Sequence, residues 1–251
     1  MLRALALALC LLSSPLAAEE VVADLSKDEV AITANFDGSD ILIYGAVKRD
    51  APAAADPMQV IITVAGPKQE VNVRKKDWRY GIWVNTSAVE VDAAPSFYAV
   101  ASSGALSDVL TETEDLRHGI SIPRAIRSVG APSDVENATE FTEALIRIRT
   151  KKNLYQQLDN TVNLFDETLF STTIDLPANL VEGPYDTHIF LVRNGVIVDD
   201  YATVINVNKV GLERWIYDLA HQKPLIYGLL SLFIAIAAGW MASAVFRYIR
   251  F

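Results

Sequence analysis

The densest charged motif in the chain is Arg74-Lys75-Lys76-Asp77-Trp78-Arg79, in which four basic side chains surround one tryptophan. Such a cluster at the end of a predicted strand could bind a small anion or lipid headgroups. It also fits a solvated strand edge, whose charges discourage pairing with another strand. Both interpretations stay open. The candidate anion-binding residues are Arg74, Lys75, Lys76 and Arg79.

The common catalytic motifs are absent from the sequence. We find no glycine-rich phosphate loop, no G-x-S-x-G nucleophile elbow and no HExxH pair, and the three histidines, His118, His188 and His221, are dispersed. The single cysteine, Cys10, excludes a disulfide scaffold and a cysteine-ligated metal site. Because a fold can bring distant residues together, dispersion does not exclude a site. We nevertheless expect no enzyme, no cofactor and no metal.

Charge and hydropathy divide the chain into a polar middle and two apolar ends. There are 22 lysines and arginines against 31 aspartates and glutamates, a net charge of −9. An acidic protein cannot neutralise a phosphate backbone over a broad surface, so we exclude nucleic acid as a partner. The 251 residues allow one large or two small domains.

The first end, residues 1–18, has the pattern of a secretory signal peptide. Arg3 supplies the positive charge, residues 4–12 form the apolar run, and small residues precede Glu19. We therefore predict that the mature chain begins at Glu19 and is exported.

The second end contains 23 residues without a charge, 224–246, with Lys223 on one side and Arg247 on the other. As a helix this segment crosses a hydrocarbon core of roughly 30 Å, so it predicts a single transmembrane helix. The basic tail 247–251 favours a cytoplasmic C-terminus under the positive-inside rule. The bulk of the chain would then lie in the periplasm, attached to the bacterial inner membrane.

Residues 19–132 are predicted to form a mainly β part, an immunoglobulin-like sandwich. Trp78, Trp83, Phe97 and Tyr98 are expected as its core and rim aromatics. The predicted strands are 21–25, 29–35, 41–48, 59–65, 70–74, 80–85 and 97–102.

An amphipathic helix is predicted to interrupt the strands over residues 133–158, with Ser133 or Asp134 as its N-cap. A second β-rich part, 159–209, follows, with strands 169–176, 187–193 and 196–207. Asn194-Gly195 within it has the signature of a type I′ hairpin turn. Its strands are too few for an independent sandwich, so we expect it to complete or pack on the first part.

Two features near the C-terminus suggest contacts with the membrane and with a partner. Residues 210–223 predict an amphipathic helix whose Trp215 and Tyr217 are candidate membrane-interface residues, although a helix packed on the exported domain explains the pattern equally well. Small residues recur every four positions in the predicted transmembrane helix, which would let another helix approach closely. These candidate helix-contact residues are Ser231, Ala235, Gly239 and Ser243. The partner helix would belong to another inner-membrane protein or to a second copy of the chain.

Several segments resemble a family of transmembrane proteins found mainly in alphaproteobacteria. They include AGPKQEVNVRKKDWRYGIWVN, PSFYAV, RHGIS, EGPYDTHIFLVRNG and GLERW, with the YGL, GW and FR elements of the anchor. The resemblance covers nearly the whole mature chain. It implies a signal peptide, a periplasmic domain, one C-terminal anchor and no assigned activity. It also implies a link to membrane exporters of the sulfite and organosulfonate class, beside which such proteins are often encoded.

Two functions fit these patterns. The first is a non-enzymatic accessory protein of a multispanning inner-membrane partner, an anion exporter of the sulfite or organosulfonate type. The alternative is an envelope assembly factor or chaperone that presents a sheet edge of its β-rich domain to exported clients.

Overall fold

The structure is a computed structural model and describes residues 19–33, 36–49, 56–127, 138–210 and 212–249. The predicted signal peptide, residues 1–18, and the proposed N-caps Ser133 and Asp134 lie outside these ranges. The described residues fall into two compact units. The first runs to Val30 and from Asp37 to Val207, and the second comprises Ala31–Phe36 and the residues from Asn208 onwards.

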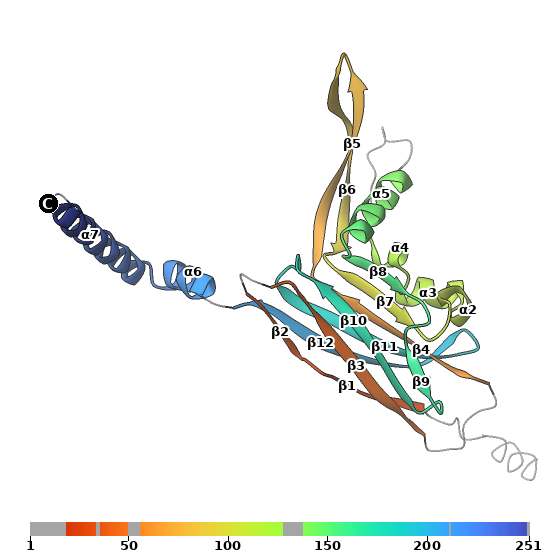
Figure 1. Cartoon of the computed structure of the whole chain (residues 1–251). Helices are drawn as coiled ribbons and strands as arrows, with labels where there is room; N and C mark the ends of the chain where they lie inside the picture. The colour runs from red at the N-terminus through yellow and green to blue at the C-terminus, as the bar shows by residue number, and fades with distance from the viewer. Residues whose placement is uncertain (1–18, 34–35, 50–55, 128–137, 211, 250–251) are drawn as a thin grey trace, which may run out of the picture. The chain divides into compact units, whose positions relative to one another are not determined.

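The first unit contains a four-stranded sheet (Figure 1). Its strands are antiparallel and lie in the order β1-β3-β10-β9. Side chains along β3 alternate between buried and exposed, as a strand with one covered face requires. The strands are β1 (Glu19–Leu25), β3 (Gly38–Arg49), β9 (Asn163–Phe165) and β10 (Leu169–Pro177).

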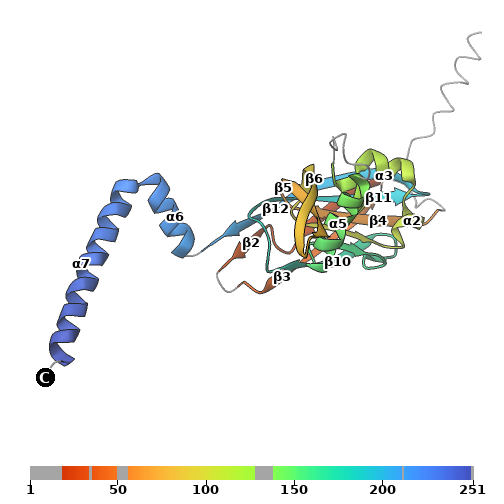
Figure 2. The ribbon, with the colours of Figure 1, turned by 90° about the horizontal axis from the view of Figure 1, so that it is seen from above.

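A six-stranded sheet, in the order β2-β12-β11-β4-β7-β8, lies against the first (Figures 1 and 2). The central strand β4 is buried on both faces, so its sequence is apolar except for Gln59 and Thr63. The pairing of β7 with β8 is parallel, unlike those of β4 with β7 and β11. The strands are β2 (Glu29–Ile32), β4 (Met58–Ala65), β7 (Tyr98–Ser102), β8 (Tyr155–Leu158), β11 (Gly183–Arg193) and β12 (Val196–Lys209).

Four helices and the base of a hairpin cover one face of the six-stranded sheet. Ile61, Val100 and Phe190 on this face join a buried cluster with Phe141 and Leu145 of the longest helix. The three shorter helices were not predicted, because each is too brief to show a helical period. The helices are α2 (Leu106–Val109), α3 (Glu112–His118), α4 (Ile122–Ala125) and α5 (Ala138–Lys151).

The predicted helix 133–158 is too long at its C-terminal end. Helix α5 stops at Lys151, and Asn153 then adopts a left-handed backbone conformation with φ of 56°. Tyr155 is buried, and its hydroxyl donates a hydrogen bond of 2.9 Å to the carbonyl of Pro95. Burial raises the pKa of Tyr155 to about 12. These contacts place Tyr155–Leu158 in the sheet as β8.

Strands β5 (Lys68–Arg79) and β6 (Ile82–Pro95) form a long antiparallel hairpin and a separate two-stranded sheet. Both run further than the predicted strands 70–74 and 80–85. Tyr80 lies in the turn rather than in a strand, since Tyr80 and Gly81 both have positive φ, as a type I′ turn requires.

The second β-rich part is not separate from the first. Strand β10 pairs with β3, and β11 pairs with β4, so residues from both predicted parts share the two sheets. Asn194 and Gly195 have φ of 52° and 77°, which confirms the predicted turn. The fold is mainly β, as predicted, and its immunoglobulin-like detail stays a prediction.

The second unit contains helices α6 (Leu212–Gln222) and α7 (Pro224–Ile249). Within the described ranges, α7 is the one helix long and apolar enough to cross a membrane, over Pro224–Val245. None of its apolar window is buried against other parts of the protein. This agrees with the predicted transmembrane segment 224–246.

Candidate functional site

The outer part of the β5–β6 hairpin projects from the first unit (Figure 1). At its base, Val73, Val89 and Val91 are buried in the cluster beneath the helices. Beyond them the strands leave the body of the domain (Figure 1). The side chains of Trp78 and Trp83 are 56% and 63% exposed, and Tyr80 in the turn is fully exposed. The two tryptophans were expected in the core or rim, and this expectation is wrong, since none of the other elements that the structure describes covers them.

The predicted anion-binding residues all lie on this outer part, but their surroundings differ. Lys75 Nζ lies 3.4 Å from Glu140 of α5, and Arg79 Nε lies 3.4 Å from Asp77. Arg74 and Lys76 have no ion-pair partner among the residues that the structure describes. The sequence therefore identified the basic cluster. The structure shows which of its cations form an ion pair with another described residue.

A groove of about 590 Å³ runs between the hairpin and α5. Arg74, Lys75 and Lys76 line it from the hairpin, and Glu140 and Glu143 line it from α5. The two carboxylates oppose the cations, so the groove itself is a poor site for a small free anion. Anion binding by the four basic residues remains a prediction.

A second hollow brings together two histidines that are dispersed in the sequence. His118 of α3 and His188 of β11 both lie beside Phe190, with ring centroids 5.7 and 5.8 Å from its ring. They line a cleft of about 230 Å³ together with Asp186 and Asp200. Among the described residues no group of three or more such side chains could hold a metal ion. In the sequence, the one local indication of this cleft is the placement of Asp186 and His188 two residues apart, on the same face of a strand.

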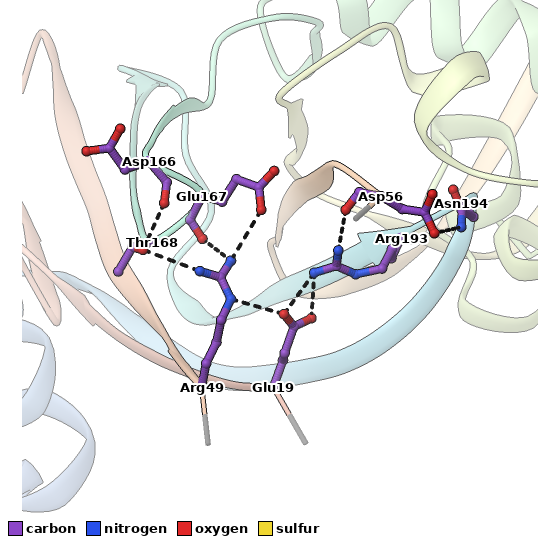
Figure 3. Close-up of polar contacts among 8 residues, drawn as sticks. All are labelled: Glu19, Arg49, Asp56, Asp166, Glu167, Thr168, Arg193 and Asn194. Carbon is purple, nitrogen blue, oxygen red and sulfur yellow. Dashed lines mark hydrogen bonds and ion pairs between the residues drawn. The ribbon is translucent and has the colours of Figure 1, made fainter. Parts of the chain in front are cut away.

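Glu19, the first residue of the predicted mature chain, joins the two sheets through its carboxylate (Figure 3). One oxygen accepts a hydrogen bond of 3.0 Å from Arg49 Nε, and both oxygens lie within 2.9 Å of Arg193 Nη2. The three side chains are between 10% and 14% exposed. Arg193 also donates to the carbonyl of Asp56. This network was not predicted, because its members are far apart in the sequence.

The second unit carries the predicted membrane-facing residues. Trp215 and Tyr217 of α6 are exposed, and the Tyr217 ring stacks on His221 at 4.0 Å between centroids. A Cβ placed on Gly239 would meet no atom within 4 Å, so this side of α7 is open. Ser231, Ala235 and Ser243 are exposed on the same helix. Their role in helix contact stays a prediction.

An exposed apolar helix that follows a β-rich domain is the organisation of a single-pass membrane protein. The sequence model of a family described as "Putative transmembrane protein (Alph_Pro_TM)" matches residues 20–248. The chain belongs to this family. The resemblance inferred from the sequence is thereby confirmed. No curated protein matches the chain significantly.

The family match includes the sheets, the hairpin and α7 of this Alph_Pro_TM protein. The hairpin and the membrane helix are thus parts of one family unit rather than additions to it.

Proposed function

We propose that this Alph_Pro_TM protein is a non-enzymatic accessory protein of a multispanning inner-membrane partner, an anion exporter of the sulfite or organosulfonate class. Its β-rich domain lies in the periplasm, its short tail lies in the cytoplasm, and α7 contacts the partner within the bilayer.

The observation that carries this proposal is the surface of α7. Its bulky side chains, such as Leu229, Phe233 and Trp240, are exposed, as lipid contact requires. Small residues line another side, where a Cβ on Gly239 would meet open space. A passive anchor needs only hydrophobicity, whereas close packing of two membrane helices needs small side chains. The helix therefore supports a partner within the membrane.

Copurification tests this proposal. The full-length protein, tagged at its C-terminus and extracted in a mild detergent, should retain one multispanning protein in a fixed stoichiometry. Recovery of the protein alone, or of many unrelated proteins in variable amounts, would contradict an accessory role. Recovery of a second copy of the chain and nothing else would show that α7 drives self-association instead.

The orientation of the chain gives a separate prediction. Alkaline phosphatase fused after Lys209 should be active, because that residue precedes the membrane helix and is expected in the periplasm. The same enzyme fused after Phe251 should be inactive, and a cytoplasmic reporter at that position should be active. The reverse pattern would overturn the proposed topology.

The free edges of the β5–β6 hairpin favour a second candidate function. Among the described residues each of these strands pairs with one other strand, and β6 makes one further isolated bridge, between Ala93 and Arg127. An extended client segment can add to the remaining length of such an edge. An envelope assembly factor of this kind would bind clients without α7. An accessory protein that depends on the anchor would lose its partner when α7 is removed.

A further inference from the structure

The outer end of the β5–β6 hairpin, residues 74–83, combines exposed aromatic rings with two cations, Arg74 and Lys76, that form no ion pair with any described residue; we call it the hairpin tip. Tyr80 is fully exposed in the turn, and Trp78, Ile82 and Trp83 flank it with more than half of each side chain exposed. We propose that the hairpin tip binds the headgroup layer of a membrane that contains anionic phospholipids. This inference does not depend on the accessory role or on any exporter.

The two faces of the hairpin tip differ in charge. Along β5, Arg74, Lys76 and Trp78 alternate with Lys75, Asp77 and Arg79, which places the two sets on opposite faces of the strand. The register shifts between Lys75 and Lys76, where Thr86 is an extra residue on β6. Trp83 pairs with Trp78 in the strand register, and their rings are 5.4 Å apart in an edge-to-face arrangement. Both tryptophans therefore share a face with the two cations; we call it the cationic face.

Two carboxylates contact cations of the opposite face, whereas Glu90, which pairs with Asn72, lies on the same face as Arg74. Asp77 contacts Arg79, and Glu140 of α5 contacts Lys75. On the cationic face, the residues paired with Arg74 and Lys76 are Ala88 and Asn85, which carry no charge. Within the described residues, Arg74 and Lys76 form no ion pair, and both also line the groove that Glu140 and Glu143 line from α5.

The spacing of these groups matches a headgroup layer. Lys76 and Trp78 are two residues apart, roughly 7 Å along an extended strand, and a headgroup layer is roughly 5–7 Å thick on each side of the hydrocarbon core. Tryptophan and tyrosine favour this layer because their rings are partly apolar and partly polar. Lys76, two residues behind Trp78, can reach a lipid phosphate.

The shape of the hairpin tip favours a lipid surface over other anions. The turn at Tyr80 is convex, and a Cβ on Gly81 would meet no atom within 4 Å, while the groove beside Arg74, Lys75 and Lys76 has two carboxylates in its wall. In addition, this family member is anchored by α7, so a lipid surface accompanies every copy of the hairpin.

The experiment uses the full-length chain with Cys10→Ser and Ile82→Cys, labelled at residue 82 with an environment-sensitive fluorophore. The protein is placed in nanodiscs of phosphatidylcholine alone or with 30% phosphatidylglycerol. In a third sample, phosphatidylcholine discs are mixed with vesicles that contain 30% phosphatidylglycerol. Brominated lipids should quench the label when phosphatidylglycerol is in the same disc or in the added vesicles. They should not quench it in phosphatidylcholine alone.

The cations are tested by Arg74→Gln with Lys76→Gln. These exposed substitutions should lower the equilibrium constant for the quenched state by about thirtyfold, the effect of two cations at an anionic surface. The matched control is Lys151→Gln with Lys152→Gln, which removes the same charge from exposed positions at the other end of α5. It should change the equilibrium constant for the quenched state less than twofold. Circular dichroism should show the same sheet content in both variants.

Three results would overturn the proposal. The first is a label that stays open to an aqueous quencher in every phosphatidylglycerol sample. The second is equal loss of quenching in the control variant, which would indicate an effect of net charge alone. The third is protection of residue 82 only when a protein partner or an extended peptide is added, which would make the hairpin a protein-binding element.

Discussion

Replacing Glu19 with glutamine is expected to lower the free energy of unfolding of the β-rich domain by about 3 kcal/mol. The substitution leaves Arg49 and Arg193 largely buried beside a neutral amide, so both cations lose a carboxylate that compensates their desolvation, and among the described carboxylates Arg49 keeps only Glu167, 3.7 Å away. Such a loss lies at the low end of the effect of breaking a buried ion pair, because the group is still about one tenth exposed. It corresponds to a fall in Tm of roughly 6–12 °C for a domain of this size.

The measurement is thermal unfolding of the full-length protein in detergent, followed by circular dichroism of the strands. Glu20→Gln is the matched control, since it makes the same change on the next residue. Its ion pair with Lys48, at 3.1 Å, has both side chains more than 60% exposed and should contribute less than about 0.5 kcal/mol. Equal stability of the two variants would show that the Glu19 network does not join the sheets energetically.

Gly239→Leu is expected to weaken association with the membrane partner about tenfold. Leucine keeps α7 hydrophobic and able to insert, but its bulk prevents close approach of another helix. Loss of a contact of about 1.4 kcal/mol produces a tenfold change in the equilibrium constant. The measurement is the amount of partner that copurifies with the tagged full-length protein over a series of detergent dilutions.

Two controls separate bulk on one face from bulk anywhere on the helix. Ala237→Leu also enlarges a small residue, but positions 237 and 239 point about 160° apart on an α-helix. Ile236→Leu changes shape at nearly constant volume about 60° around α7 from Gly239, so it tests a change of shape without added bulk. If all three variants retain the partner equally, α7 is only an anchor, and the contact must be sought in α6 or in the β-rich domain.

Local sequence patterns predict the elements whose residues follow a regular hydropathy pattern or a known turn motif. An uncharged run long enough to span a bilayer identifies α7 without any knowledge of its neighbours. Alternation of apolar and polar residues identifies β3, and Asn194-Gly195 identifies a turn, because only certain residues accept positive φ at both positions. The basic cluster at residues 74–79 is equally visible as composition.

Pairing between distant strands is decided only in three dimensions. Alternation states which side chains of β3 face a core, but it does not say that β10 will be its neighbour. The same strand pattern is compatible with one domain or two until the faces are buried against each other. Trp78 and Trp83 illustrate the converse case, since their apolar character predicts burial and only the course of the hairpin leaves them exposed.

The Glu19 network shows the same limit at the level of charge. Glu19 and Arg193 are 174 positions apart, and nothing in either neighbourhood indicates that they meet. Glu19 lies on β1 and Arg193 on β11, which belong to different sheets. Their ion pair forms because the ends of these two strands come together in the folded domain (Figure 3). The free energy of a contact depends on distance and burial, and both are properties of the packed sheets rather than of the residues in order.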